Sequence, residues 1–266
     1  MSILSNLAYI HPEAKIGKNV IIDAFAYIDK NVEIGDGTHV HAHASILSGA
    51  RIGENNEIFE NAIISASPQD FRWKGEDSFV VIGDNNKIRE QVIINRSILA
   101  DGKTEIGSNS FIMAQTHIGH DSKIGNYCVL GNAVKIAGNV IINNYSILSS
   151  NALVHEKCHI GEWVLIKGGC RVNGHVPPFA VMAHNPISYF GVNAYVLKKA
   201  KKPDEIIDDI AKCYRHVYQT GTSVFNALRR IKDDVEESPE REMIIKFIED
   251  HKNQLAAVPL VDSYDY

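Results

Sequence analysis

Aliphatic side chains recur at every sixth position of the chain, in a single phase, from Ile10 to Val172. A helix would repeat near 3.6 residues and a half-buried strand at two, so neither simple element explains this period. A strict six-residue repeat is typical of a parallel β-helix, in which short strands meet at regular corners. The longest unbroken run of these anchor positions is Ile106, Ile112, Ile118, Ile124, Leu130, Ile136, Ile142, Leu148, Val154, Ile160, Ile166 and Val172.

Glycines indicate how many repeats close one coil. Gly17, Gly35 and Gly53 are separated by three hexads each, and each follows an anchor. Three hexads therefore predict one triangular coil, with the strands of successive coils about 4.8 Å apart. We expect glycine at this corner because it tolerates unusual backbone angles, and we expect Asn143, in the same column, to be left-handed. The position two before each anchor is mostly small, which suits the narrow interior of a prism.

The repeat is interrupted twice without losing its phase. Residues 65–79 carry Asp70 and Glu76 at anchor positions, and residues 99–103 carry Ala100. We interpret both segments as excursions from the prism. Loops that leave a regular scaffold often carry function.

The hexads stop after Val172, and the apolar spacing becomes helical from about Pro203. Ser238 followed by Pro239 is typical of a helix start, with serine as the N-cap and proline in the first turn. The sequence therefore predicts an all-β parallel β-helix over residues 1–190 and a C-terminal α-helical domain over residues 191–266. Such a cap suits the end of a β-helix, which otherwise exposes apolar surface and unpaired backbone.

Composition and charge narrow the partners and the compartment. A net charge of −5 gives no reason to expect a nucleic-acid partner. The chain has no apolar run long enough to span a bilayer, and its N-terminus lacks the form of a signal peptide. We therefore expect a cytoplasmic protein without membrane insertion. Three of its four cysteines occupy the small inward position, which predicts core residues rather than ligands or disulfides: Cys128, Cys158 and Cys170.

The first histidine cluster is His39, His41 and His43. Alternation along a strand would place all three on the outside of the prism. No acidic residue or cysteine stands beside them along the chain, so we interpret them as surface residues and expect no metal site.

The second cluster offers candidate chemistry. His120 is followed by Asp121, and a carboxylate can orient a catalytic imidazole. Moving one coil of three hexads onward from His120 gives Gly138, where a ligand could approach the main chain closely. A base beside an open N–H is what acyl transfer needs, because one removes a proton and the other stabilises the oxyanion. We expect a single strip of reactive groups formed by His120, Gly138, Asn139, His155 and Glu156.

Several stretches resemble one family of enzymes, namely residues 117–121, 135–138, 153–156, 175–178 and 190–193. They are similar to the UDP-N-acetylglucosamine O-acyltransferases, and the resemblance covers essentially the whole chain. It implies a left-handed β-helix, an exception to right-handed crossovers, and a homotrimer with active sites in clefts between neighbouring prisms. It also implies transfer of a 3-hydroxyacyl group from acyl carrier protein to the 3-hydroxyl of UDP-N-acetylglucosamine. That reaction is the first step of lipid A biosynthesis and uses no metal or other cofactor.

The resemblance implies roles for individual residues. His120 matches the general base, assisted by Asp121, and the N–H of Gly138 matches the oxyanion donor. Gly168 and Gly169 lie where the family measures acyl length, and small residues there favour a longer chain. Positions that match substrate-contacting residues are Gln69, Asp70, Arg72, His117, Asn139, His155, Glu156, Asn193 and Lys199.

Some residues depart from the family's pattern. Arg72 stands where a lysine is common, Asn139 replaces a histidine, Glu156 a glutamine, Tyr195 a glutamate and Lys199 an arginine. These departures bear on binding of the diphosphate and nucleoside, and leave the base unchanged. On charge alone, the basic cluster of Lys198, Lys199, Lys201 and Lys202 fits a solvated face or a docking patch. The resemblance favours docking of the acidic carrier protein.

Other functions are compatible with hexads. A zinc enzyme of the γ-carbonic anhydrase type shares the fold and would need three histidines converging from adjacent chains, for which His117, His120 and His155 are available. An N-acyltransferase that modifies an already acylated sugar carries an extra N-terminal domain, and hexads that begin by Ile10 leave no room for it. A β-helix without catalysis is the remaining alternative, and the polar strip and the two excursions disfavour it.

Overall fold

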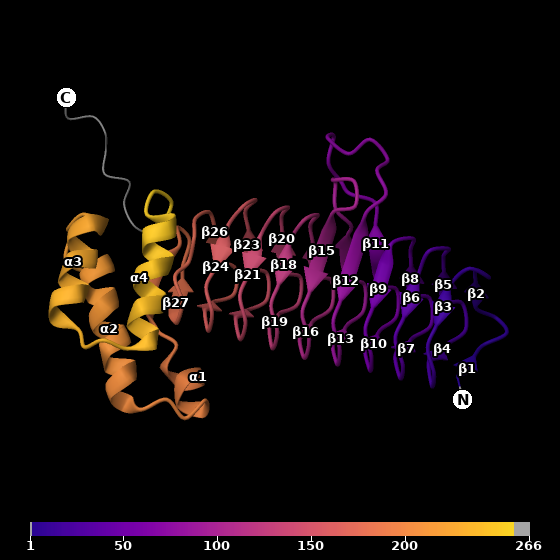
Figure 1. The fold of residues 1–266 in the computed structure, drawn as a ribbon, viewed down its shortest axis with the longest axis horizontal. Coiled ribbons are helices and arrows are strands. Elements are labelled where there is room, and N and C mark those ends of the chain that lie inside the picture. The colour runs from indigo at the N-terminus through magenta and orange to yellow at the C-terminus, as the bar shows by residue number, and fades with distance from the viewer. Residues whose placement is uncertain (1, 258–266) are drawn as a thin grey trace.

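The computed structural model describes residues 2–257 and shows a three-sided prism with helices at one end (Figure 1). Three parallel sheets, which we call A, B and C, form the sides of the prism. From β1 to β26, successive strands enter the three sheets in rotation, so each sheet takes every third strand, and β27 and β28 then both join sheet A. The predicted β-helix is therefore confirmed.

Sheet A has eleven strands, and its last two form an antiparallel hairpin. Its strands are β1 (Ile3–Leu4), β4 (Ile21–Ile22), β7 (His39–Val40), β10 (Glu57–Ile58), β13 (Lys87–Ile88), β16 (Phe111–Ile112), β19 (Val129–Leu130), β22 (Ile147–Leu148), β25 (Leu165–Ile166), β27 (Ala180–Ala183) and β28 (Ser188–Val192).

Sheets B and C complete the prism. Sheet B contains β2 (Tyr9–Ile10), β5 (Tyr27–Ile28), β8 (Ser45–Ile46), β11 (Ile63–Ala66), β14 (Ile93–Asn95), β17 (His117–Ile118), β20 (Lys135–Ile136), β23 (Leu153–Val154) and β26 (Arg171–Val172). Sheet C contains β3 (Lys15–Ile16), β6 (Glu33–Ile34), β9 (Ala50–Ile52), β12 (Phe79–Ile82), β15 (Lys103–Ile106), β18 (Lys123–Ile124), β21 (Ile141–Ile142) and β24 (His159–Ile160).

The strand register explains why the phase survives the interruptions. Ile106 pairs with Ile124, which is one regular coil of three hexads further along the chain. Across the first excursion Ile52 pairs with Ile82, five hexads away, and across the second Ile82 pairs with Ile106, four hexads away. The insertions therefore amount to two hexads and one hexad. Because both are whole hexads, every anchor after each excursion still points inward.

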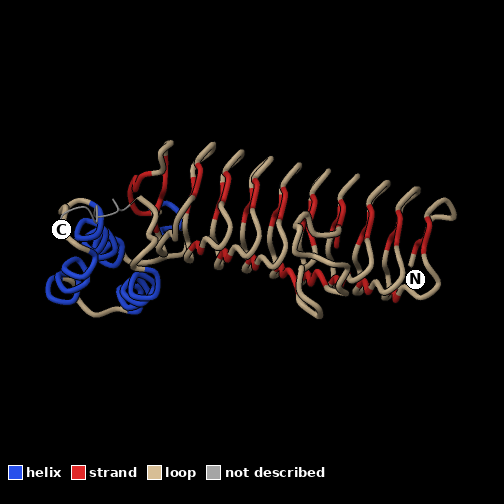
Figure 2. Tube along the Cα trace, turned by 90° about the horizontal axis from the view of Figure 1, so that it is seen from above, coloured by secondary structure: helices blue, strands red, loops and turns tan. Residues whose placement is uncertain are grey.

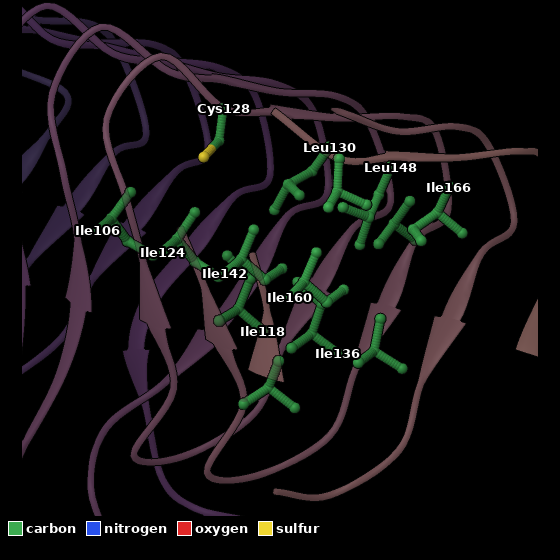
Figure 3. Packing of buried hydrophobic residues seen from close by; sticks show 14 of the residues in the cluster. Ile106, Ile118, Ile124, Cys128, Leu130, Ile136, Ile142, Leu148, Ile160 and Ile166 are labelled. Carbon is green, nitrogen blue, oxygen red and sulfur yellow. The ribbon is translucent and has the colours of Figure 1, made fainter. Parts of the chain in front are cut away.

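The core is a stack of aliphatic ladders. Figure 3 shows Ile124, Ile142 and Ile160 following one another in a row across successive coils, and all three are fully or almost fully buried. Backbone N–H groups of one coil donate to carbonyls of the next, so the ladders are held by hydrogen bonds along the prism. The predicted inward cysteines are confirmed as buried and unpaired, namely Cys128, Cys158 and Cys170.

The expected role of the corner glycines is wrong. Gly17, Gly35 and Gly53 have ordinary backbone angles, and a Cβ on Gly35 would lie 2.5 Å from the carbonyl carbon of Gly53. These glycines therefore serve close approach of stacked corners. The left-handed residues stand three positions after an anchor, as at Asn31 with φ 53°, and Asn143 is not among them.

Within residues 2–257, four helices follow the strands and cover the end of the prism (Figure 2). They are α1 (Ala194–Lys199), α2 (Asp204–Tyr218), α3 (Val224–Asp234) and α4 (Pro239–His251). The predicted start of α4 is confirmed, because the Ser238 side chain accepts a hydrogen bond from the Arg241 N–H and Pro239 opens the helix. Residues 258–266 of the predicted helical domain lie outside the described residues. None of the helices described is long and apolar enough to cross a membrane.

Candidate active site

His120 and Asp121 lie at the corner between sheets B and C. β17 ends at Ile118, whose side chain is buried as an anchor, and the chain then turns into β18. Asp121 takes the left-handed angle of this corner, with φ 61°. Its Oδ2 lies 2.7 Å from Nδ1 of His120, and a carboxylate in that position favours a proton on Nδ1.

Asp121 is itself held by groups that the sequence reading missed. Ser97 Oγ donates to Asp121 Oδ1, and the Ile98 N–H donates to Oδ2 at 3.3 Å. The N–H of Asp121 donates to Thr104 Oγ1 at 2.8 Å. Ser97 and Thr104 are fully buried and flank the second excursion. The spacing in the sequence could have identified Ser97. It precedes Asp121 by four hexads, which is one regular coil of three hexads plus the single hexad inserted by the second excursion.

Gly138 lies directly against the His120 ring. A Cβ at residue 138 would lie 2.4 Å from both Cε1 and Nε2 of His120, so only glycine leaves room for the imidazole. Among residues 2–257, the Gly138 N–H donates to no acceptor, as at several equivalent corners, whereas the Lys18 N–H is capped by Asp36 Oδ1 at 2.8 Å. The corner thus presents an imidazole nitrogen and an unused N–H side by side.

The first excursion folds back over this corner. Oδ2 of Asp70 lies 3.3 Å from Nε2 of His120, and Arg72 binds Asp70 through its Nη2 at 2.7 Å and its Nε at 2.9 Å. Arg72 Nη2 also lies 3.3 Å from Glu156 Oε1. These hydrogen bonds from Arg72 hold the pKa of the Asp70 carboxyl well below its usual range. Asp70 is therefore an acceptor throughout the physiological range.

The two excursions touch each other. The Asp101 N–H donates to the Asp77 carbonyl at 2.9 Å, and Ser78 Oγ donates to the Ser97 carbonyl at 2.6 Å. Figure 1 shows both segments rising from the same side of the prism, near β11 and β15. The loop over the strip and the loop that holds Asp121 thus support one another.

His117 lies on β17, before the corner, and His155 follows the end of β23. His117 stacks in register between Ile93 and Lys135 on the outer face of sheet B. Burial, with smaller contributions from Lys135 and His120, lowers its pKa. His155 lines a cavity of about 740 Å³ together with Arg171, Asn173 and Asn185.

Of the remaining predicted residues, Asn139 alone contacts His120 within the described chain. Gln69 is exposed in the first excursion. Asn193 is buried and its Nδ2 donates to the Trp163 carbonyl at 2.8 Å. Lys199 lies in α1 with its ammonium 4.5 Å from the centre of the Tyr195 ring. Gly168 and Gly169 lie between β25 and β26, and a Cβ on Gly169 would meet only open space. Asn139, beside Gly138, donates its N–H to the His120 carbonyl at 2.9 Å.

The reading that no acid lies beside the first histidine cluster is wrong. Asp23 Oδ2 lies 2.9 Å from His39 Nε2 and 3.7 Å from His41 Nδ1. Asp23 is not a sequence neighbour of these histidines. It lies beside them because it is one coil away, three hexads before His41.

Comparison with known proteins places the chain among acyltransferases. Residues 175–256 match the family model of UDP N-acetylglucosamine O-acyltransferase, domain 2. Residues 103–138 match six repeats of the bacterial transferase hexapeptide, and residues 4–104 match the GMPPB C-terminal domain.

Relatives match over most of their length. The acyl-[acyl-carrier-protein]–UDP-N-acetylglucosamine O-acyltransferase of Aliarcobacter butzleri is 36% identical over 88% of this chain and 90% of its own. That of Xylella fastidiosa is 34% identical over 71% and 72%.

Solved structures agree with the fold. A UDP-N-acetylglucosamine acyltransferase from Bacteroides fragilis is 46% identical and has a TM-score of 0.90, covering 93% of this chain and 97% of its own. The enzyme from Francisella novicida is 36% identical with a TM-score of 0.88, covering 95% and 93%. These likenesses confirm the predicted left-handed β-helix.

Proposed function

Because this chain belongs to the UDP-N-acetylglucosamine O-acyltransferase family, we propose that His120, Asp121 and Gly138 carry out its reaction. The enzyme transfers an acyl group from acyl carrier protein to UDP-N-acetylglucosamine in lipid A biosynthesis. The observation that supports these residue roles is the His120 ring, placed between the Asp121 carboxylate and the free N–H of Gly138.

The proposed steps follow from the positions of these groups. Nε2 of His120 takes the proton of the sugar 3-hydroxyl as that oxygen attacks the thioester carbon of a 3-hydroxyacyl donor. The oxyanion of the tetrahedral intermediate accepts a hydrogen bond from the Gly138 N–H. When the carbon–sulfur bond breaks, His120 returns the proton to the leaving thiolate. Asp121 keeps the ring oriented and stabilises the imidazolium during the cycle.

Asp70 and Arg72 have a separate proposed role in holding the acceptor. Asp70 lies against Nε2 of His120, so the sugar 3-hydroxyl must displace that contact to reach the base. The ionised Asp70 can then accept hydrogen bonds from the sugar. Arg72 and the neighbouring Lys157 supply positive charge that suits the diphosphate.

We further propose that the protein is a homotrimer. Sheet A presents outward-facing apolar side chains on four consecutive strands, and an apolar stripe of this length is typical of an interface. Its members are Phe111, Val129, Ile147 and Leu165. Packing sheet A against a neighbouring prism would enclose a cleft beside sheet B, where His117 and the strip lie.

Within such a cleft, the remaining predicted residues receive roles. Gly168 and Gly169 would border the acyl chain, because Gly169 faces open space. Asn193 would shape this end of the cleft indirectly, through its bond to Trp163. Among the described residues, Lys198 pairs with Asp204 and Lys202 with Glu240, so the lysines left to meet an acidic carrier protein are Lys199 and Lys201.

The γ-carbonic anhydrase alternative is not favoured. The similar proteins are acyltransferases, and both ring nitrogens of His120 face carboxylates. The cytoplasmic location stays a prediction, and free, buried cysteines are compatible with it.

The test is a transfer assay with UDP-N-acetylglucosamine and acyl carrier protein thioesters of graded chain length. We expect an O-acylated product and higher rates with the longer 3-hydroxyacyl donors. A strict preference for the shortest donor would contradict the proposed acyl pocket. Transfer only to the 3-amino analogue of the sugar would contradict the proposed acceptor.

A further inference from the structure

We propose that Asp23, His39 and His41 form a binding site for a divalent transition-metal ion such as Zn²⁺. Their ligand atoms all lie within 4.8 Å of one another. Nitrogen and oxygen ligands lie about 2.0–2.2 Å from zinc, which puts two ligands of a tetrahedral ion about 3.4 Å apart. The observed separations from Asp23 Oδ2 are 2.9 Å to His39 Nε2 and 3.7 Å to His41 Nδ1. Small side-chain movements therefore suffice to admit an ion.

The coil geometry makes this grouping. His39 lies on the outer face of β7 and His41 at the corner that follows, so the two rings lie side by side with centres 3.9 Å apart. Asp23 takes the same corner one coil earlier, where its N–H donates to the Val40 carbonyl at 2.9 Å. The coil repeat thus adds a carboxylate to a His-x-His pair.

The His41 ring is fixed in place before any ion binds. It is stacked between His39 on one side and Phe59 on the other, with a ring distance to Phe59 of 4.6 Å and an angle of 9°. Arg89 covers the far face of Phe59 at 4.3 Å. A ligand that is already immobilised loses little entropy on binding.

Further carboxylates surround the three ligands. Glu57 Oε1 lies 3.5 Å from His41 Nε2, and Glu60 Oε1 lies 3.8 Å from His41 Nδ1. Among the described residues, the buried His41 Nε2 has no hydrogen-bond partner. A carboxylate facing the second nitrogen of a metal-bound histidine orients the ring and strengthens it as a ligand. Glu57 is placed for that role, and Glu60 for a fourth ligand.

The site is separate from the acyl-transfer strip. The strands β7, β10, β13 and β16 follow one another along sheet A, and β16 belongs to the coil of His117. The proposed site is thus three coils from the strip, or about 14 Å along the prism at the usual strand spacing. Its metal would stabilise the N-terminal coils and take no part in acyl transfer.

The test is titration calorimetry with Zn²⁺ at pH 7.5 on the metal-stripped full-length protein. The variants are His39→Ala, His41→Ala and the shape-conserving Asp23→Asn. The matched control is His43→Ala, because His43 belongs to the same cluster but stacks on Phe25 away from Asp23. Circular dichroism shows which variants fold. If a histidine variant does not fold, Asp23→Asn still tests the proposal.

We expect the wild-type protein to bind one zinc ion per chain at this site. In the three site variants this binding should be lost or be at least tenfold weaker, while His43→Ala should match wild type. Binding at this site should also be lost at pH 5.5, since protonated histidines do not bind metals. Acyl transfer should be unchanged in every variant. Absence of zinc binding by the wild type, or equal stoichiometry and affinity in the site variants, would overturn the proposal and leave the acyltransferase assignment untouched.

Discussion

The His120 ring is confined on three sides. Asp121 holds Nδ1, Asp70 faces Nε2 and the Cα of Gly138 lies against the ring edge. A general base must be held in one tautomer and one orientation while its free nitrogen meets the substrate. These contacts supply that restriction, and two of the three come from residues far away in the sequence.

Gly138→Ala should abolish most activity without unfolding the protein. The new Cβ would lie 2.4 Å from the imidazole, so the ring must leave its position beside the backbone N–H. Displacing a general base lowers turnover by a factor of about 10² or more. Steady-state kinetics and a thermal melt separate this result from unfolding. Wild-type turnover in Gly138→Ala would contradict the proposed contact.

Ser97→Ala should lower kcat by about tenfold and leave KM for both substrates nearly unchanged. Ser97 donates to the Asp121 carboxylate, and a hydrogen bond to a charged group contributes about 1.5–3 kcal/mol. Ser110→Ala is the control, because Ser110 is equally buried but donates to the Gly125 carbonyl. Equal kcat values for the two variants would argue against a positioning role for Ser97.

For individual residues, the sequence predicts contacts between residues that are separated by whole hexads, and it misses contacts made by residues inside the excursions. Gly138 could be placed beside His120 because no insertion lies between them. Asp70 could not, since it lies in an excursion whose path depends on contacts that no period describes. Ser97 could have been found, because it precedes Asp121 by four whole hexads. Asp23 could have been found, because it obeys the period relative to His41.

Among the elements, the first excursion is the one tied to function. Its only anchor to the strip, within the described residues, is the set of contacts from Asp70 and Arg72 to His120 and Glu156. The pairs of Arg72 with Asp70 and Glu156 are partly exposed, and solvent screening leaves pairs of that kind with little net stabilisation. Breaking them to admit the sugar nucleotide therefore costs little free energy, while the loop stays tied to the second excursion through Asp77 and Ser78.

Arg72→Met should raise KM for UDP-N-acetylglucosamine by about tenfold and change kcat much less. Arg72 orients Asp70 and provides charge for the diphosphate, so its loss weakens acceptor binding before it affects the base. Lys74→Met is the matched control, since Lys74 lies in the same loop and its ammonium donates to the Phe71 carbonyl. An unchanged KM in Arg72→Met would remove Arg72 from the proposed acceptor site.

The existence and phase of both excursions could be predicted, because missing anchors mark them. Their folds could not, because residues 65–79 form no repeat. The corner conformations were assigned to the wrong column for a related reason. Glycine signals close packing as well as unusual angles, and the sequence does not distinguish the two.

For the whole molecule, the prism and its helical cap meet at a cluster of histidines. His159 Nδ1 lies 3.1 Å from His251 Nε2 of α4, and the His159 N–H donates to His175 Nδ1 at 3.0 Å. Burial lowers the pKa of His159 to about 4, with smaller contributions from His251 and His175, while Asp250 acts in the opposite direction. Burial likewise lowers the pKa of His175.

Stability should therefore fall on acidification between about pH 6.5 and pH 4. In that window the unfolded chain binds protons that the folded chain excludes, so the free energy of unfolding decreases as the pH is lowered. His159→Phe should reduce the drop in thermal midpoint between pH 7.5 and pH 5 by about 3 °C. His43→Phe, at an exposed position, is the control. An equal drop in wild type and His159→Phe would contradict this assignment.

The sequence predicts the architecture of the whole molecule well, because a period of six leaves few alternatives and Ser238-Pro239 marks a helix start. The number of chains in the assembly could not be predicted from the residues in the same way. The apolar stripe from Phe111 to Leu165 is visible in the sequence, but the number of copies that cover it depends on geometry between chains. Light scattering should give the mass of three chains.

The central claim is that His120 is the base of acyl transfer, and one measurement tests it most directly. Turnover is compared between wild type and His120→Ala with UDP-N-acetylglucosamine and a 3-hydroxyacyl carrier protein, in preparations with the same mass and thermal midpoint. We predict a fall by a factor of about 10² or more in His120→Ala, with little change in KM. Turnover close to wild type in a folded, assembled His120→Ala protein would contradict the claim.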